Sequence, residues 1–109
     1  MAEITIQELM SRMPKAFIPE KAAGTKAVVQ YHLTGEEGGD WVITIQDGKC
    51  TVVPGKTETM NLTLTADALD YKKIILGQLD AMGAFMQGKL KLAGDLTLAM
   101  KLMSFFKLS

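Results

Sequence analysis

The sequence is poor in the residue types that supply catalytic and metal-binding chemistry. It contains one histidine, His32, and one cysteine, Cys50, among 109 residues. Because a zinc-type site needs about three or four nitrogen or sulfur ligands, these two residues cannot form one, and we expect no metal and no cofactor. A single cysteine also cannot form an internal disulfide, which is typical of a protein from a reducing compartment.

The few reactive side chains that are present have structural explanations. His32 lies in the middle of an expected strand, and nothing near it forms a pair of a base and an orienting group, so we interpret it as a structural or exposed residue. Cys50 follows a turn and is expected to be a small buried apolar residue. Glu36 and Glu37 are interpreted as solvated charges in the glycine-rich loop 35–39, which lacks the lysine of a phosphate-binding loop. We therefore expect no catalytic residue and no enzymatic activity.

The charges of the chain are balanced, with twelve Lys and Arg residues against twelve Asp and Glu residues. Such a chain lacks the positive field that drives binding to phosphate backbones, so nucleic acid is not an expected partner. No apolar run approaches the roughly 18 residues that span a bilayer, and the amino terminus lacks the features of a signal peptide. The last three residues, KLS, are not a peroxisomal signal of the SKL type. We expect a cytoplasmic location and no transmembrane segment.

Methionine is the residue that the sequence has in quantity, with eight residues against an aromatic content of 6%. Its side chain is flexible and polarizable, so it fills irregular gaps in a core and also lines surfaces that accept partners of varied shape. Core filling is the commoner use, and methionine content alone favours it.

The final helix carries more apolar surface than a surface helix needs. Asp95 follows a glycine and is expected to cap a helix that continues to Phe106. At about 100° per residue, its apolar side chains cover roughly 220° of the circumference, and the polar strip is narrow. That strip consists of Thr97, Lys101 and Ser104. Such a helix either packs into a core on two sides or separates a core from a cavity for apolar molecules.

The first part of the chain combines one helix with alternating strands. A capping box formed by Thr5 and Glu8 predicts a helix that begins at Thr5, and Pro14 is expected to kink or interrupt it. Asp47 and Gly48 are typical of a tight turn between two antiparallel strands. The predicted strands cover residues 27–33, 41–46, 49–53 and 60–65.

The second part of the chain is mainly helical. A helix is predicted over residues 66–76, with Asp67 and Asp70 in its first turn, where the helix dipole favours negative charge. Asp80 is expected to cap a short helix that ends at Gln87. That helix is expected to present Met82, Phe85 and Met86 on one face.

A strand over residues 89–93 precedes the final helix. This order of elements predicts a single domain over residues 1–109 of the α+β class. We expect a sheet of roughly five strands, mainly antiparallel, with helices covering one face.

One stretch of the sequence carries a family signature. The run AFMQGKLKLAGD at residues 84–95, followed by LAMKL at 98–102, resembles the carboxyl-terminal signature of the sterol carrier protein-2, or sterol-transfer, family. Three upstream segments fall where that family has similar residues, so the resemblance covers nearly the whole chain. They are FIPEKA at 17–22, WVITIQDGK at 41–49 and MNLTLT at 60–65.

The resemblance implies a sheet in the order 3-2-1-4-5 and an apolar tunnel between the sheet and the later helices. Members of the family bind sterols, fatty acids, acyl-coenzyme A esters or phospholipids and have no catalytic residues of their own. Carried over to this sequence, the lining of the tunnel comprises Met82, Phe85, Met86, Leu90, Leu92, Leu96, Met100, Met103 and Phe106. Gln87 is a further candidate, near a lipid head group. Longer relatives carry a tail after the last helix, whereas this chain stops at Ser109, so we expect a cavity that is open or shared with a second copy.

The sequence favours a non-catalytic domain that binds and transfers lipids, a role that is compatible with transient contact with a membrane. The alternative is a structural or interaction module in which the Met-rich helical face forms a protein interface, such as that of a homodimer. A third interpretation, an accessory domain that presents acyl substrates to a separate enzyme, differs only in the partner. An exposed apolar patch marks an interaction site of any of these kinds, so the sequence does not separate them.

Overall fold

The computed structural model describes residues 4–106, with the side chain of Met103 outside that description. Two short 3₁₀ turns, η1 and η2, accompany the helices and strands. In chain order the elements are α1 (Ile6–Ala16), η1 (Pro19–Ala22), β1 (Ala27–Thr34), β2 (Gly39–Gln46), β3 (Lys49–Pro54), β4 (Leu62–Asp67), α2 (Ala68–Ile75), α3 (Ala81–Met86), β5 (Leu90–Gly94), α4 (Leu96–Leu102) and η2 (Met103–Phe105).

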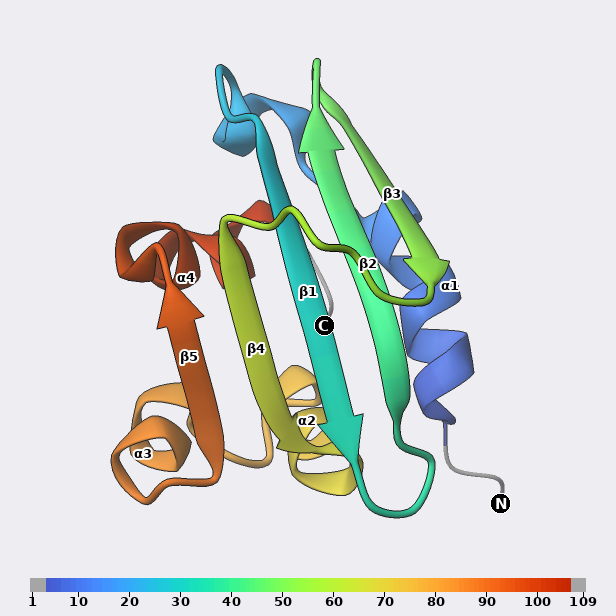
Figure 1. The fold of residues 1–109 in the computed structure, drawn as a ribbon, viewed down its shortest axis with the longest axis vertical. Helices are drawn as coiled ribbons and strands as arrows, with labels where there is room; N and C mark the ends of the chain where they lie inside the picture. The colour runs from blue at the N-terminus through green and yellow to red at the C-terminus, as the bar shows by residue number, and fades with distance from the viewer. Residues whose placement is uncertain (1–3, 107–109) are drawn as a thin grey trace.

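The five strands form one sheet in the order β3-β2-β1-β4-β5. The pairs β1–β2, β2–β3 and β4–β5 are antiparallel, and the central pair β1–β4 is parallel. All the helices lie on one face of this sheet, behind it in the view of Figure 1. The α+β class, the mainly antiparallel sheet and the order 3-2-1-4-5 are therefore confirmed.

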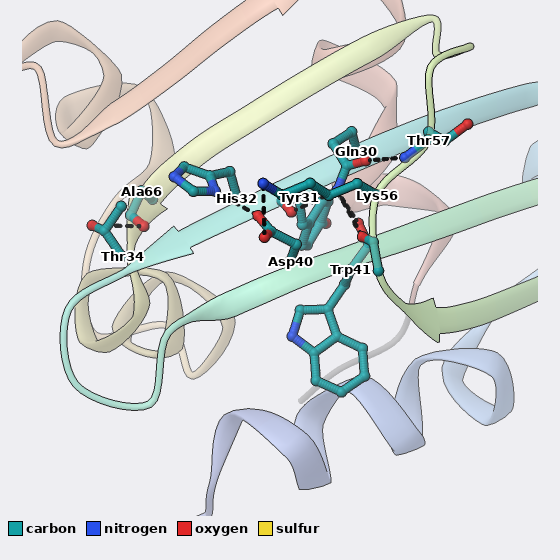
Figure 2. Close-up of polar contacts among 10 residues, drawn as sticks. Gln30, Tyr31, His32, Thr34, Asp40, Trp41, Lys56, Thr57 and Ala66 are labelled. Atoms are coloured by element: carbon teal, nitrogen blue, oxygen red, sulfur yellow. Dashed lines mark hydrogen bonds and ion pairs between the residues drawn. The ribbon is translucent and has the colours of Figure 1, made fainter.

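The parallel pair requires the chain to cross the sheet between β3 and β4. The connection passes over β2 and β1 on the face that the helices leave open (Figure 1). Gln30 of β1 holds this crossover: its Oε1 accepts from the amide of Thr57 at 2.8 Å, and its Nε2 donates to the carbonyl oxygen of Gly55 at 3.1 Å (Figure 2). Because Gln30 is buried, these hydrogen bonds are what make a polar side chain tolerable there.

Helix α1 covers the half of the sheet that contains β2 and β3. Its capping residue is Thr5, as predicted, since the Thr5 hydroxyl accepts from the amide of Glu8 at 3.1 Å. Pro14 does not interrupt the helix, which continues to Ala16, because a proline removes only one amide donor and the helix ends within the same turn. The apolar stripe of the helix is fully buried: Ile6, Leu9, Met10 and Met13. Beneath it lies Cys50, which is buried as expected, and burial raises the pKa of its thiol to about 11.

The predicted boundary between β4 and α2 is wrong. Strand β4 begins at Leu62, so Met60 lies outside the strand and is exposed. Ala66 and Asp67 belong to β4 instead of the helix, because the parallel pairing with β1 extends to Asp67 opposite Thr34. Asp67 then caps α2 by accepting hydrogen bonds from the amides of the second and third residues of the helix.

Glu37 is not the solvated loop charge that the sequence suggested. Its carboxylate accepts from Lys72 Nζ at 2.7 Å and from the amide of Ile6 at 3.1 Å, and Lys72 is only 5% exposed. One side chain of the β1–β2 loop thus joins the start of α1 to α2. The hydrogen bond from Lys72, and after it the bond from the Ile6 amide, hold the pKa of Glu37 below its usual value.

The contacts of Glu37 predict an acid-sensitive contribution to stability. A carboxyl group with a lowered pKa in the folded state stabilises the fold fully above its unfolded pKa of about 4.3, and this contribution is lost as the pH falls through the lowered value. At neutral pH, Glu37→Gln should therefore unfold at a lower temperature than the parent, because buried Lys72 loses its counter-charge. Below the folded pKa of Glu37 the two melting temperatures should converge, since the parent then also lacks the charge.

The measurement is thermal unfolding of both proteins between neutral and strongly acidic pH. Glu36→Gln is the matched control, because Glu36 is the exposed neighbour in the same loop. A difference between parent and Glu37→Gln that stays constant over the whole pH range would contradict the assignment.

Candidate functional site

An apolar cavity of about 410 Å³ lies between the β4–β5 half of the sheet and the helices α2, α3 and α4. Its volume falls in the range of roughly 300–1,000 Å³ that is typical of small-molecule sites. The residues that line it are Leu62, Leu64, Tyr71, Ile74, Ala81, Met82, Phe85, Leu90, Leu92, Leu96, Ala99, Met100 and Leu102. Every one of these side chains is apolar except for the hydroxyl group of Tyr71.

The floor of the cavity is built by β4 and β5. Because side chains alternate along a strand, Leu62 and Leu64 of β4 point to the same face, as do Leu90 and Leu92 of β5. The antiparallel register places Leu64 opposite Leu92, so the two pairs form a continuous apolar surface.

The walls come from the three short helices. Asp80 caps α3 through the amide of Gly83 at 2.8 Å, and Asp95 accepts from the amide of Leu98 in α4 at 3.0 Å, as the sequence predicts. Residues three or four apart then share a face, which turns Met82 and Phe85 of α3 toward the cavity. Leu96, Ala99 and Met100 of α4 do the same from the other side.

The mouth of the cavity lies between α3 and α4. Four lining residues are exposed, and Met100 is the most exposed of them at 77%. The four are Met82, Phe85, Leu96 and Met100. A rim of large apolar side chains therefore surrounds the opening.

The structure brings most of the expected lining residues together. Met82, Phe85, Leu90, Leu92, Leu96 and Met100 all line the cavity. Met86 does not: it is 79% exposed, because α3 ends at this residue and no other element covers it. Gln87, the residue after α3, is also exposed and outside the lining.

Phe106 is buried at a different place. Its ring packs against Phe17 with ring centroids 5.6 Å apart, and the two residues form an isolated β-bridge. Phe106 therefore closes the core near the end of α1 instead of lining the cavity. The side chain of Met103 lies outside the described residues.

Several lining residues were not expected from the sequence. Leu62 and Leu64 were predicted to share one face of a strand. They line the cavity because the strand order places β4 next to β5. Tyr71 and Ile74 of α2 carried no recognisable signal, because their face of the helix also contains core residues. The other unexpected lining residues are Ala81, Ala99 and Leu102.

Tyr71 forms a buried pair with Tyr31 of β1. The two hydroxyl oxygens are hydrogen-bonded at 2.9 Å, and the rings pack edge to face with centroids 5.2 Å apart. Burial raises the pKa of Tyr31 to about 12 and raises the pKa of Tyr71 well above its usual value. Both hydroxyl groups therefore keep their protons at neutral pH.

His32 has an acidic partner that sequence reasoning missed. Its Nδ1 lies 2.5 Å from Oδ1 of Asp40, which the β1–β2 register places directly opposite (Figure 2). The expectation that nothing nearby pairs with His32 is therefore wrong, since the partner is eight residues away across a hairpin. The His32 side chain is half exposed, and neither residue lines the cavity. The pair is a cross-strand contact on the open face of the sheet.

The described residues lack two further features. Within residues 4–106, no group of three or more His, Cys, Asp and Glu side chains is placed to hold a metal ion. In the same range, no helix has both the length and the apolar character needed to cross a membrane.

Known proteins resemble this chain in sequence and in fold. The hydroxysteroid dehydrogenase-like protein 2 of Xenopus tropicalis is 34% identical over 98 residues, which make up 89% of this chain and 24% of that protein. The chain thus spans about a quarter of the length of this relative. The crystal structure of sterol carrier protein 2 like 2 from Aedes aegypti is 26% identical, with a TM-score of 0.72, and the match covers 91% of this chain and 90% of that one.

The solution structure of palmitated SCP2L2 from Aedes aegypti has a TM-score of 0.77, a sequence identity of 24% and a coverage of 93% of both chains. The model of the SCP-2 sterol transfer family matches residues 6–107. This match covers almost the whole sequence, and the chain belongs to the SCP-2 sterol transfer family.

Proposed function

We propose that this chain binds lipids in the cavity beside β4 and β5 and passes them to acceptors without catalysing a reaction itself. The observation that carries the proposal is a cavity of about 410 Å³ whose described lining residues carry a single polar side-chain group, the hydroxyl of Tyr71. Burial of apolar ligand surface there is favourable by about 25 cal/mol per Å² before the costs of association. Membership of a sterol transfer family and a fold neighbour that is described as palmitated support the same function.

The chemistry of the lining supports binding instead of catalysis. Catalysis by a protein needs a nucleophile, a general base or charge-stabilising donors at the reacting atoms. The described lining residues carry no charge, and Tyr71 is the one among them with a hydroxyl group. Met82 and Met100 at the mouth can adapt to ligands of different shape, so fatty acids, acyl esters, phospholipids and sterols are all candidates.

Lipid binding should stabilise the protein against heat. A ligand at about 100 times its dissociation constant adds roughly 2.7 kcal/mol, which for a domain of this size raises the melting temperature by about ten degrees or more. Thermal unfolding with palmitate, an acyl-coenzyme A, a phospholipid and cholesterol, each compared with protein alone, measures the effect. If none of the four lipids raises the melting temperature, the proposal fails.

Filling the cavity should remove binding and preserve the fold. Ala99 lines the cavity, so the ring added by Ala99→Phe has empty space to occupy. Ala68 is fully buried in the packed core, where extra volume forces strain of about 1–3 kcal/mol or more. We expect Ala99→Phe to unfold at the same denaturant concentration as the parent protein but to bind a fluorescent fatty acid no longer. Ala68→Phe should unfold at a much lower denaturant concentration.

Chemical denaturation and a titration with the same fluorescent lipid on the three proteins decide the matter. Stable Ala99→Phe protein that binds the lipid like the parent would exclude this cavity as the site. Loss of stability equal to that of Ala68→Phe would mean that the space around Ala99 is not available to a ligand.

A second candidate function rests on the exposed rim. Met100 and its exposed neighbours form an apolar surface that is suited to a partner protein, either a second copy of the chain or an enzyme that receives the lipid. The Xenopus relative, of which the chain spans a quarter, is named as dehydrogenase-like, which supports the second of these partners. Native mass spectrometry of the purified chain separates the candidates: we expect a monomer with bound lipid, whereas a lipid-free dimer would favour the interface.

A further inference from the structure

One residue in the lining of the cavity carries a polar side-chain group, and its position limits which ligands suit the site. Among the described residues, Tyr71 is the only lining residue with a hydroxyl group. It is 2% exposed, and its partner Tyr31 is 1% exposed, so water does not reach the pair freely. Because Tyr71 borders the cavity, a molecule in the cavity is the candidate partner for a further hydrogen bond of this pair.

The two hydroxyl groups of Tyr31 and Tyr71 carry two protons, and only one of these protons is in a hydrogen bond. Each phenolic hydroxyl can donate one hydrogen bond and can also accept. The bond between Tyr71 and Tyr31 uses one of the two protons, and no described residue is hydrogen-bonded to either hydroxyl besides this pair. A buried donor without an acceptor is unfavourable, so a ligand oxygen that accepts this proton would be bound more tightly.

Of the two tyrosines, Tyr71 is the one that a ligand in the cavity can contact. In the structure Tyr71 donates to Tyr31, but a hydroxyl rotates to suit its neighbours, and Tyr31 can donate to Tyr71 equally well. Tyr31 does not line the cavity, whereas Tyr71 does. With the reversed direction, Tyr31 donates to Tyr71, and the proton of Tyr71 is free for an oxygen of a ligand in the cavity.

The charges around the pair favour an uncharged oxygen. A carboxylate that is buried in an apolar site needs a positive charge beside it. Lys72 follows Tyr71 in the sequence, but its ammonium group is 2.7 Å from Glu37 and Lys72 does not line the cavity. An ionised fatty acid therefore keeps its carboxylate at the mouth, whereas an alcohol or ester oxygen can enter to Tyr71.

We propose that Tyr71, supported by Tyr31, recognises an uncharged oxygen of the lipid, such as an alcohol hydroxyl or an ester carbonyl. This inference rests on the proposed lipid-binding function. It distinguishes ligands by their polar end, which the apolar lining alone does not do.

Three ten-carbon ligands test the inference by displacement of a fluorescent fatty acid: 1-decanol, decane and decanoate, at a pH at which decanoate is ionised. In Tyr71→Phe, the affinity for 1-decanol should fall roughly two- to tenfold, the range for loss of one hydrogen bond. The affinities for decane and decanoate should be unchanged. Tyr31→Phe breaks the same tyrosine pair but keeps the Tyr71 hydroxyl, so it should bind 1-decanol at least as well as the parent.

The outcomes separate the two proposals. If the parent protein does not bind the fluorescent fatty acid, the lipid-binding function fails. If it binds this probe but 1-decanol does not displace it, the recognition of an uncharged oxygen fails. If 1-decanol displaces the probe, but Tyr71→Phe weakens 1-decanol and decane equally, or both variants weaken 1-decanol equally, the recognition role of Tyr71 is overturned.

A measurement on the unmutated chain covers the case in which Tyr71→Phe does not fold. The sequence contains two tyrosines, so labelling with 3-fluorotyrosine gives two fluorine resonances, which Tyr31→Phe assigns. We expect 1-decanol to shift the Tyr71 resonance more than decane does. Equal shifts with the two ligands would contradict the proposal.

Discussion

The two halves of the sheet are covered differently, and the cavity lies under the half that several short helices cover. The β2–β3 half is covered by α1, which has 11 residues and is about 16 Å long, and four buried apolar side chains fill the space beneath it. The other half is covered by α2, α3 and α4, which have 8, 6 and 7 residues and are about 9–12 Å long. Protein interiors normally pack densely, but the side chains of these three separate helices leave a cavity above β4 and β5. The resulting empty apolar space costs stability, and a ligand that fills it recovers the lost contacts.

Polar contacts hold together the densely packed half of the domain under α1. They also hold in place α2, which forms one wall of the cavity. Gln30 holds the crossover that allows β4 to pair with β1, and without that pairing β4 would not form the cavity floor. Glu37 connects α1 to Lys72, which is the neighbour of Tyr71 in α2. The wall that carries the hydroxyl group is therefore anchored to the densely packed half of the domain. Helices α3 and α4 hold the mouth, where their apolar side chains face solvent.

Local signals in the sequence were sufficient for most of the fold. Caps at Thr5, Asp80 and Asp95 use side chains within three residues of the amides that they bind, so the residue types alone mark the helix starts. Alternation in the strands identified their buried faces for the same reason. The end of β4 was not predictable in this way, because it depends on pairing with β1 about thirty residues earlier.

Contacts between residues far apart in the sequence explain which features of the site and its surroundings could not be predicted. Tyr31 and Tyr71 are 40 residues apart, and Glu37 and Lys72 are 35 apart, so neither pair leaves a pattern in the sequence. Helical spacing predicted that Met82, Phe85 and Met86 share one face of a helix. The helix α3 ends at Met86, however, and the side chain of Met86 is exposed to solvent. Periodicity shows which side chains share a face of a helix, but it does not show where the helix ends or whether another element covers that face.

The composition of the lining sets how selective such a cavity can be. Burial of apolar surface is non-directional, and leucine and methionine side chains can rearrange around ligands of different shape, so the lining discriminates mainly by size. One hydrogen bond adds about 0.5–1.5 kcal/mol net, which corresponds to roughly a two- to tenfold preference. Discrimination of a larger order requires several buried polar groups that a wrong ligand would leave unpaired. Among the described lining residues Tyr71 is the single one with a polar side-chain group, so the proposed recognition separates classes of lipid by the charge of the polar end and does not separate lipids within one class.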